Sequence, residues 1–254
     1  MNSNTKPSDT TFFVIKDGSF SSKLPSTSLA LKDPDGLLAL GGDLKPQTLL
    51  SGYKEGIFPW YSEADPITWW APHHRSIIEP SQVHISRSMY RLIRKNTIKI
   101  SCNKAFSEVI YQCGNTAGRK DNTWITQDMI DAYSKLHQLG FAHSIECWQN
   151  NKVIGGLYGV SIGNIFFAES MFSNIANASK LAFIFLCLRL AVMQFAIIDC
   201  QIHSSHLATM GAKQIARSRF ENLLKTTNWE INKMKTWEMD PCLSRSLLAK
   251  YAEI

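Results

Sequence analysis

Two carboxylates and one amide flank the most apolar part of the sequence, and their positions could support chemistry. Glu169 ends a run with the character of a strand, and Asp199 and Gln201 lie two residues apart in a second such run. Residues two apart on a strand face the same side of a sheet, so Asp199 and Gln201 are predicted to share one face. Acids in an apolar setting need partners, because burial of an unpaired carboxylate is unfavourable. Spacing alone favours a structural interpretation, in which Glu169 caps a helix and Asp199 is hydrogen-bonded in the core.

A cysteine and two histidines near these acids suggest two other kinds of site. Cys200, His203 and His206 resemble metal ligands in spacing, but no second cluster accompanies them, so no metal is expected. Cys200, His206 and Asp199 could form a nucleophilic site, but neighbours on a strand point in opposite directions. The segment Gly-Gly-Leu-Tyr-Gly at 155–159 lacks the spacing of a dinucleotide loop. It is predicted to be a strand with close backbone packing, and no cofactor is expected.

A basic helix face and several tryptophans could contact nucleic acid. Between residues 87 and 104 the chain has six basic residues and no acidic one. The spacing predicts a helix over 84–95 with an apolar face and an opposite basic face, made of Arg87, Arg91, Arg94 and Lys95. This basic face is either an ordinary solvated surface or one that follows phosphates. Tryptophans near predicted turns belong to the core by default, but an exposed ring could stack on an unpaired base. These are Trp60, Trp69, Trp70 and Trp124.

The elements that must position these residues follow from periodicity and turn residues. Three strands are predicted at 143–149, 152–160 and 163–170, because two hairpin turns separate them. A long apolar helix from about Ala178, a strand at 195–202 and a helix at 218–226 follow. Upstream, a helix is predicted from Thr126 to Gly140, and a shorter one from residues 43–45 to Tyr53. Strands and helices in this order predict an α+β protein with mixed α/β layers.

The first part of the chain differs in character from the rest. Up to Arg75 it is dense in Pro and Gly and has only short predicted elements. This contrast predicts a small N-terminal α/β domain over 1–75, of which about the first twelve residues are disordered, and a larger domain over 76–254.

Composition excludes several classes of protein. Hydrophobic residues make up 44% and charged residues 19% of the 254 residues, which is typical of a globular chain. The formal net charge of +6 mildly favours a polyanionic partner. The apolar run from Leu181 to Ile198 is not expected to span a membrane, because Arg189 and Gln194 interrupt it. The N-terminus lacks a signal-peptide pattern and the six cysteines form no CxxC pair, so a cytoplasmic protein with reduced thiols is predicted.

Nine motifs, in this order, resemble one enzyme family. They are GLLALGGDL, YKEGIFPWYS, WWAPHHR, TWI, AYSKLHQLGFAHSIECW, GGLYGVSIGNIFFAESMFS, NASK, IDCQ and HLATMGA. Together they extend from about residue 29 to 220 and resemble the leucyl/phenylalanyl-tRNA–protein transferases. Two loops depart from the family's pattern, since CGNTAGRKDNTWI lacks the usual Ala-x-Pro-Arg and APHHR replaces a more common Ser-Pro-Asp-Pro-Arg.

The resemblance implies a function, a fold and a set of site residues. The family transfers Leu or Phe, less readily Met, from aminoacyl-tRNA to proteins with N-terminal Arg or Lys, which marks them for N-end-rule degradation. The fold would be a small N-terminal domain followed by one similar to the Gcn5-related acetyltransferases, and the protein would be a monomer. The catalytic residues would be Glu169, Asp199 and Gln201. The terminal adenosine would lie near Trp60 and Trp124. The transferred side chain would be held by Phe166, Met171 and Ile198.

Two other functions stay open at this point. An acyl-CoA-dependent N-acetyltransferase would need a Gly-rich turn before the long helix to hold a pyrophosphate, and the turn Ser-Asn-Ile-Ala-Asn-Ala-Ser-Lys has no glycine. A non-enzymatic RNA-binding module would explain the basic helix but would leave Glu169, Asp199 and Gln201 without a role.

Overall fold

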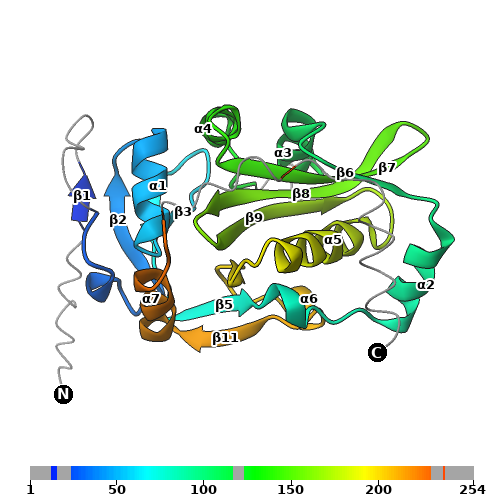
Figure 1. Cartoon of the computed structure of the whole chain (residues 1–254). Coiled ribbons are helices and arrows are strands. Elements are labelled where there is room, and N and C mark those ends of the chain that lie inside the picture. Colours follow the sequence, from blue (N-terminus) through cyan, green and yellow to red (C-terminus); the bar gives the residue numbers. More distant parts are fainter. Residues whose placement is uncertain (1–12, 16–23, 117–122, 230–236, 238–254) are drawn as a thin grey trace, which may run out of the picture.

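Two β-sheets with helices packed on them form the molecule (Figure 1). The computed structural model describes residues 13–15, 24–116, 123–229 and 237. The architecture is α+β with mixed α/β layers, as the sequence predicts. The predicted disorder of the first dozen residues concerns a segment that lies outside the described residues.

The smaller sheet comes from the N-terminal part of the chain. Its strand order is β1 (Phe13–Ile15), β2 (Leu37–Gly41), β4 (Thr68–Trp70) and β3 (Phe58–Pro59). A single-turn helix, η1 (Thr27–Leu29), precedes β2, and α1 (Pro46–Lys54) connects β2 to β3. Pro46 suits the first turn of α1 because its missing N–H would have no partner there. Gly56 ends this segment at φ +79, as the sequence predicts.

Seven strands of the described residues form the larger sheet. Their order is β11 (Lys213–Ala216), β5 (His74–Ile78), β10 (Ile197–Asp199), β9 (Ile165–Ser173), β8 (Lys152–Ile162), β7 (Ala142–Gln149) and β6 (Lys99–Cys102). Neighbouring strands are antiparallel except β9 and β10, which are parallel and joined by α5 (Ala178–Val192). The strand that contains Arg75 thus belongs to the larger sheet. The domain division at residue 75 stays a prediction.

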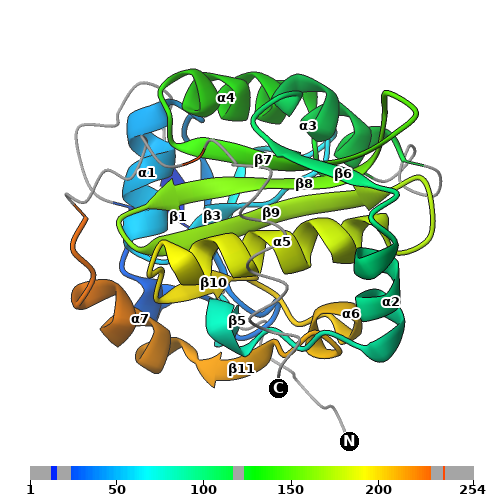
Figure 2. The same cartoon turned by 45° about the vertical axis from the view of Figure 1, so that its right-hand side comes forward.

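Helices cover both faces of the larger sheet (Figures 1 and 2). The helices α3 (Phe106–Asn115) and α4 (Gln127–Gln138) pack on one face, and α5 packs on the other. The helix α5 buries twelve of its fifteen residues, as expected of a helix that is apolar on all sides. The elements η2 (Pro80–Gln82), α2 (Arg87–Lys95) and α6 (Ser205–Ala208) pack on the α5 side. No helix in the described part of the chain is long and apolar enough to cross a membrane.

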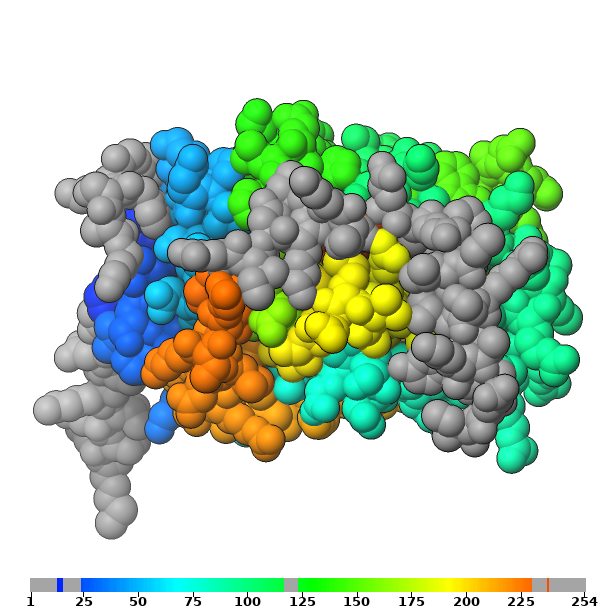
Figure 3. All heavy atoms as spheres, in the orientation of Figure 1, coloured from blue at the N-terminus to red at the C-terminus, as the bar shows by residue number. Residues whose placement is uncertain are grey.

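The last helix in the described part of the chain, α7 (Arg217–Lys225), connects the end of the larger sheet to the N-terminal part. In Figure 3 it lies at the surface beside the N-terminal elements. The hydroxyl of Thr27 donates to Glu221 (2.5 Å), and Arg217 Nη1 donates to the carbonyl of Ala71 (2.8 Å). These contacts hold the smaller sheet against the larger one.

Local predictions from turn and cap residues are confirmed. Asn150 and Asn151 have φ values of 51° and 59°, which suit the two-residue turn between β7 and β8. The Oγ1 atom of Thr126 accepts the Met129 N–H (3.3 Å) at the start of α4. A Cβ atom at Gly155 would lie 2.5 Å from the Cβ atom of Ala178, so the predicted close packing of this strand is also confirmed.

Several elements differ from the prediction. The helices α3 and α6 and the strands β6 and β11 are not expected from the sequence reasoning above. The strand predicted over 195–202 is shorter, because β10 covers only Ile197–Asp199. Gln194 and Gln201 take left-handed conformations, with φ values of 58° and 59°, and these bound the strand on either side.

Candidate active site

A pocket of about 450 Å³ lies where β9 and β10 part. The two strands pair only from Ile165 to Phe167 and from Ile197 to Asp199, and β9 then continues to Ser173 without β10 beside it. The pocket opens along this second half of β9. Its wall consists of Thr116, Trp124, Leu157, Ala168, Glu169, Ser170, Met171, Phe172, Ser173, Ser179, Cys200, Gln201, Ser204, His206 and Leu207.

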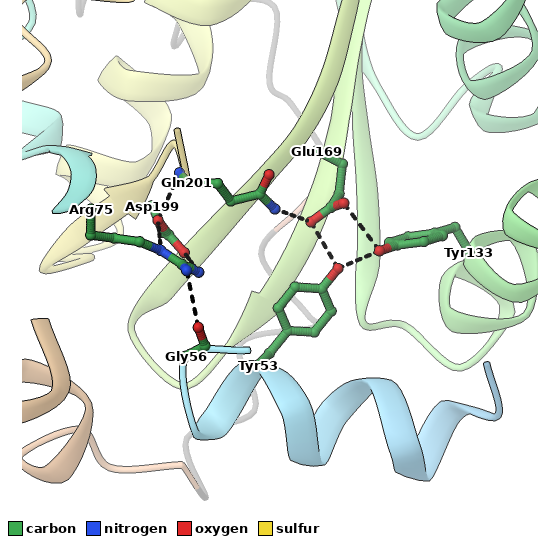
Figure 4. A network of polar contacts seen from close by, with 7 residues as sticks. All are labelled: Tyr53, Gly56, Arg75, Tyr133, Glu169, Asp199 and Gln201. Atoms are coloured by element: carbon green, nitrogen blue, oxygen red, sulfur yellow. Dashed lines mark hydrogen bonds and ion pairs between the residues drawn. The ribbon is translucent and has the colours of Figure 1, made fainter. Parts of the chain in front are cut away.

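Glu169 is the only carboxylate among these lining residues, and three side chains bind it (Figure 4). Tyr53 on α1 donates to Oε1 (2.8 Å), Tyr133 on α4 donates to Oε2 (3.0 Å), and the Gln201 amide nitrogen donates to Oε1 (2.9 Å). The two tyrosine hydroxyl groups also contact each other. The predicted helix-capping role of Glu169 is therefore wrong, since its partners are side chains from three separate elements.

Burial raises the pKa of Glu169 to about 7, above its ordinary value of 4.5, although the hydrogen bonds from Tyr53, Tyr133 and Gln201 act in the opposite direction. The contacts of the two tyrosines also favour a protonated Glu169. Two hydroxyl groups and one carboxyl group make three mutual contacts, and two hydroxyl protons can fill only two of them. With both tyrosines donating to Glu169, the contact between the two hydroxyl groups has no proton. When Glu169 is protonated, Oε2 can donate to Tyr133 and the Tyr133 hydroxyl can donate to Tyr53, so that all three contacts are filled. Burial and the charge of Glu169 also raise the pKa of both tyrosines well above 10.

Asp199 lies behind the pocket rather than in its wall. It is fully buried and forms a two-point ion pair with Arg75, from Nε to Oδ1 (2.8 Å) and from Nη2 to Oδ2 (2.6 Å). Its Oδ1 atom also accepts the backbone N–H of Gln201 (2.9 Å). A buried carboxylate with this set of partners is satisfied, which agrees with the structural interpretation of this acid.

Gln201 does not share a face with Asp199. The prediction assumed continued strand alternation, but β10 ends at Asp199 and Gln201 adopts φ +59. The Gln201 side chain therefore points toward Glu169, whereas Asp199 points toward Arg75 (Figure 4). A left-handed conformation costs a non-glycine residue roughly 1–2 kcal/mol, so the surrounding contacts must hold it.

The predicted substrate-binding residues separate into two groups. Met171 and Trp124 line the pocket together with Glu169 and Gln201. Phe166 and Ile198 do not line it, because both are fully buried in the apolar layer between the sheet and α5. Trp60 also lies outside the pocket wall; it is 39% exposed and packs edge-on against Trp70.

The predicted basic face is present on α2. Met89 and Ile93 are buried against the α5 side of the sheet. The N–H of His84, just before this helix, donates to the carbonyl of Met210 (3.0 Å), which follows α6. Because His206 and Leu207 of α6 line the pocket, α2 stands next to one wall of the site. Its basic side chains are all exposed; they are Arg87, Arg91, Arg94 and Lys95.

Sequence reasoning missed three residues of the site. Arg75, Tyr53 and Tyr133 lie within motifs that carry the family resemblance, but nothing in their spacing connects them to Glu169 or Asp199. A weak signal existed for the tyrosines, since each lies on the apolar side of a predicted helix and a buried tyrosine hydroxyl needs a partner.

The nucleophile and metal interpretations find no support in the geometry. Burial and the nearby Asp199 raise the pKa of the Cys200 thiol, which disfavours the thiolate that a nucleophile requires. His203 is exposed and lies outside the pocket wall. Across the described ranges, no three His, Cys, Asp or Glu side chains are arranged to hold a metal ion.

Comparison with known proteins gives a consistent family. Residues 77–225 match the family model "Leucyl/phenylalanyl-tRNA protein transferase", and residues 42–73 match the model of its N-terminal domain. A protein of Psychromonas ingrahamii named leucyl/phenylalanyl-tRNA–protein transferase is 53% identical over 215 residues, which cover 84% of this chain and 90% of that protein. A protein of the same name from Teredinibacter turnerae is 47% identical over 210 residues, which cover 82% of this chain and 81% of that protein.

Solved structures give a weaker likeness. L-PGS from Bacillus licheniformis is 10% identical, with a TM-score of 0.39 over 85% of this chain and 72% of that one, which is too low to assign a fold. The family models and the relatives suffice for a conclusion. The chain belongs to the leucyl/phenylalanyl-tRNA–protein transferase family.

Proposed function

We propose that this protein transfers Leu or Phe, and less readily Met, from aminoacyl-tRNA to proteins that begin with Arg or Lys, and so marks them for N-end-rule degradation. One observation carries the proposal: in a chain of this family, Glu169 and Gln201 are hydrogen-bonded to each other in the wall of a pocket that also has apolar lining. Its volume is typical of a site for a small ligand.

The chemistry requires little more than these groups. An aminoacyl ester is already activated, so neither a covalent nucleophile nor a metal ion is needed. An N-terminal amine has a pKa of about 8, so part of it is neutral near pH 7. The enzyme must orient this amine and accept its proton as the amide bond forms and the tRNA hydroxyl leaves.

Glu169 and Gln201 fit these two tasks. The amide nitrogen of Gln201 is bound to Glu169, which leaves the amide oxygen to accept a hydrogen bond from the attacking amine. Glu169 attracts the cationic acceptor when it is ionised. Because its pKa is about 7, it can also take up the proton that the amine loses.

The apolar lining suits the transferred side chain. Met171, Leu157 and Phe172 line the pocket beside Glu169. Trp124 lines the same pocket and offers a ring on which the terminal adenosine can stack. Phe166 and Ile198 act from behind, as the packed layer that supports this wall. Trp60, which is partly exposed, contacts the nucleotide outside the pocket.

The rest of the donor is held by charge. The basic face of α2 follows the acceptor-stem phosphates. Its exposure and its place beside α6 support this role.

The larger sheet, with its β9–α5–β10 crossover, is of the Gcn5-related acetyltransferase type, and the protein acts as a cytoplasmic monomer.

Acetyl transfer from acyl-CoA is the second candidate. It would place a pyrophosphate at the N-terminus of α5, where Asn177 takes φ +70 and no glycine opens the turn. Transfer to a labelled Arg-initiated peptide from Phe-tRNA, compared with transfer from acetyl-CoA, decides between the two. We expect the labelled Phe product with Phe-tRNA alone, and none when the peptide's amino group is acetylated. Acetylation without Phe transfer would overturn the proposal, and binding of tRNA without either product would leave only an RNA-binding module.

A further inference from the structure

Arg75 lies outside the pocket, but its guanidinium group contacts Asp199 and Gly56 (Figure 4). These two residues are close in sequence to Gln201 and Tyr53, which both bind Glu169. Two of its nitrogen atoms bind Asp199, at 2.8 and 2.6 Å, and the third donates to the carbonyl of Gly56 (3.0 Å). The Arg75 and Asp199 side chains are 1% and 0% exposed. A forked pair of this kind fixes direction as well as distance, which a single ammonium group would not do.

Two aromatic rings fix the guanidinium group further. Its central carbon lies 4.7 Å from the ring centre of Phe58 and 4.7 Å from that of Phe220. Phe58 belongs to β3 and Phe220 to α7, while Arg75 itself belongs to β5. Two elements that are distant in sequence, β3 and α7, therefore hold one planar group from β5 between their rings.

The first link leads from Arg75 to Gln201. Asp199 Oδ1 accepts the backbone N–H of Gln201 (2.9 Å), and the N–H of Ser76 donates to the carbonyl of Gln201 (3.0 Å). Both main-chain groups of Gln201 are thus held from β5, one directly and one through the ion pair. These contacts maintain the left-handed conformation that directs the Gln201 amide toward Glu169.

The second link leads from Arg75 to Tyr53. Gly56 follows α1, and its N–H donates to the carbonyl of Tyr53 (3.0 Å). The Tyr53 hydroxyl donates to Glu169 (2.8 Å). By binding the Gly56 carbonyl, Arg75 holds the end of the helix that presents Tyr53.

We propose that Arg75 is a positioning residue for the transfer reaction, which through Asp199 fixes Gln201 and through Gly56 fixes Tyr53, on the two sides of Glu169. Asp199 transmits this position and does not touch the substrate, because it is fully buried and outside the pocket wall. The inference rests on the proposed function for its kinetic tests, but one structural test is independent of it.

The first test replaces the fork and keeps the charge. In Arg75→Lys, we expect kcat for transfer from Phe-tRNA to an Arg-initiated peptide to fall by about tenfold or more, with KM for Phe-tRNA changed by less than about twofold. Arg217→Lys is the matched control, because Arg217 also binds a main-chain carbonyl, that of Ala71, but has no link to Asp199. We expect parental kinetics for this control. A folded Arg75→Lys protein with the parental kcat would overturn the proposal.

The second test is a double-mutant cycle of Arg75→Gln and Asp199→Asn. If Arg75 acts mainly through Asp199, the loss of kcat caused by Arg75→Gln should shrink to about threefold or less in the Asp199→Asn background. The double variant also removes both buried charges together, so it remains testable where a single variant fails to fold. The proposed link would be contradicted if the kcat losses of the two single variants multiplied in the double variant. A parental kcat in the folded double variant would contradict it as well.

The third test does not need activity. Hydrogen exchange of the Gln201 backbone amide should be slow in the parent and about tenfold faster or more in Arg75→Lys, because its acceptor loses its fixed position. Unchanged exchange at Gln201 would overturn the inference whatever the enzyme does. A parent protein with the expected exchange but no transfer would overturn only the proposed function.

Discussion

Glu169→Gln should make the protein more stable than its parent at high pH, and the gain should depend on pH. In the unfolded chain the carboxyl group ionises near its ordinary value of 4.5, whereas in the folded protein its pKa is about 7. Between these values the folded state retains a proton that the unfolded state has lost. The folded parent is therefore destabilised as pH rises from 4.5 through 7, and the effect levels off above that.

The magnitude follows from the difference between the two pKa values. Each unit corresponds to about 1.36 kcal/mol, so the pKa values of 4.5 and about 7 give about 3 kcal/mol at full effect. Gln has no proton to lose and the same shape, and its amide oxygen can accept from Tyr53 or Tyr133. The free energy of unfolding of the variant, minus that of the parent, should rise by about 3 kcal/mol between pH 4.5 and pH 8.

Urea unfolding followed by tryptophan fluorescence at half-unit steps of pH measures this difference. Taking variant minus parent cancels the other titrating groups, which both proteins share. Glu79→Gln is a suitable control, because Glu79 is 46% exposed and pairs with Lys213 at the surface. We expect a much smaller change with pH for the control. A flat difference for Glu169→Gln, or a gain that shrinks as pH rises, would refute the assignment of a proton to the ring of Glu169, Tyr53 and Tyr133.

Three further predictions concern the pocket, the basic helix and the core. Met171→Ala should lower kcat/KM for Leu-tRNA and Phe-tRNA by an amount that corresponds to a few kcal/mol at most in activation free energy. Ile, which is β-branched, should be a poor donor in the parent, because branching next to the reacting carbon narrows the path of the attacking amine. Equal transfer of Ile and Leu would disprove this. Replacing Arg91 and Arg94 by Gln should weaken binding of a Phe-tRNA analogue and lower its salt slope by about 1.5–2, whereas Trp124→Ala should cost about 1–3 kcal/mol with the slope unchanged. Trp237→Ala should lower the free energy of unfolding, measured by urea unfolding, by about 3–5 kcal/mol, because Trp237 is 2% exposed and stacks on His143; an unchanged free energy would disprove this.

The sequence predicts local structure well where single residues determine the backbone. Asn150, Asn151 and Gly163 mark the hairpin turns, and Thr126 and Gly140 bound α4, because each has a conformational or capping preference of its own. The helix α3 also has a signal in the sequence. Its buried apolar positions 106, 109, 110 and 113 have helical spacing.

The long-range partners of the site could not be predicted from the pattern. Tyr53 reaches Glu169 because α1 packs against the larger sheet, and Arg75 reaches Asp199 because β5 pairs with β10, which comes much later in the chain. No periodicity encodes either contact. Strand alternation also failed at Gln201, where tertiary hydrogen bonds hold a conformation that a glutamine does not prefer. The identity of Glu169, Asp199 and Gln201 as site residues came from the family resemblance. The catalytic roles of Glu169 and Gln201 and the positioning role of Asp199 stay a proposal.

The position of β5 also constrains how the chain can fold during synthesis. This strand is made early, yet it lies between β10 and β11, which both belong to the last quarter of the chain. Until the ribosome has released those segments, β5 has neither neighbour, and Ile77 and Ile78 lack their pairing partners. The larger sheet is therefore completed only near the end of translation. A nascent chain that stalls before β11 leaves an edge of β5 unpaired, and chaperones must protect such an apolar strand edge.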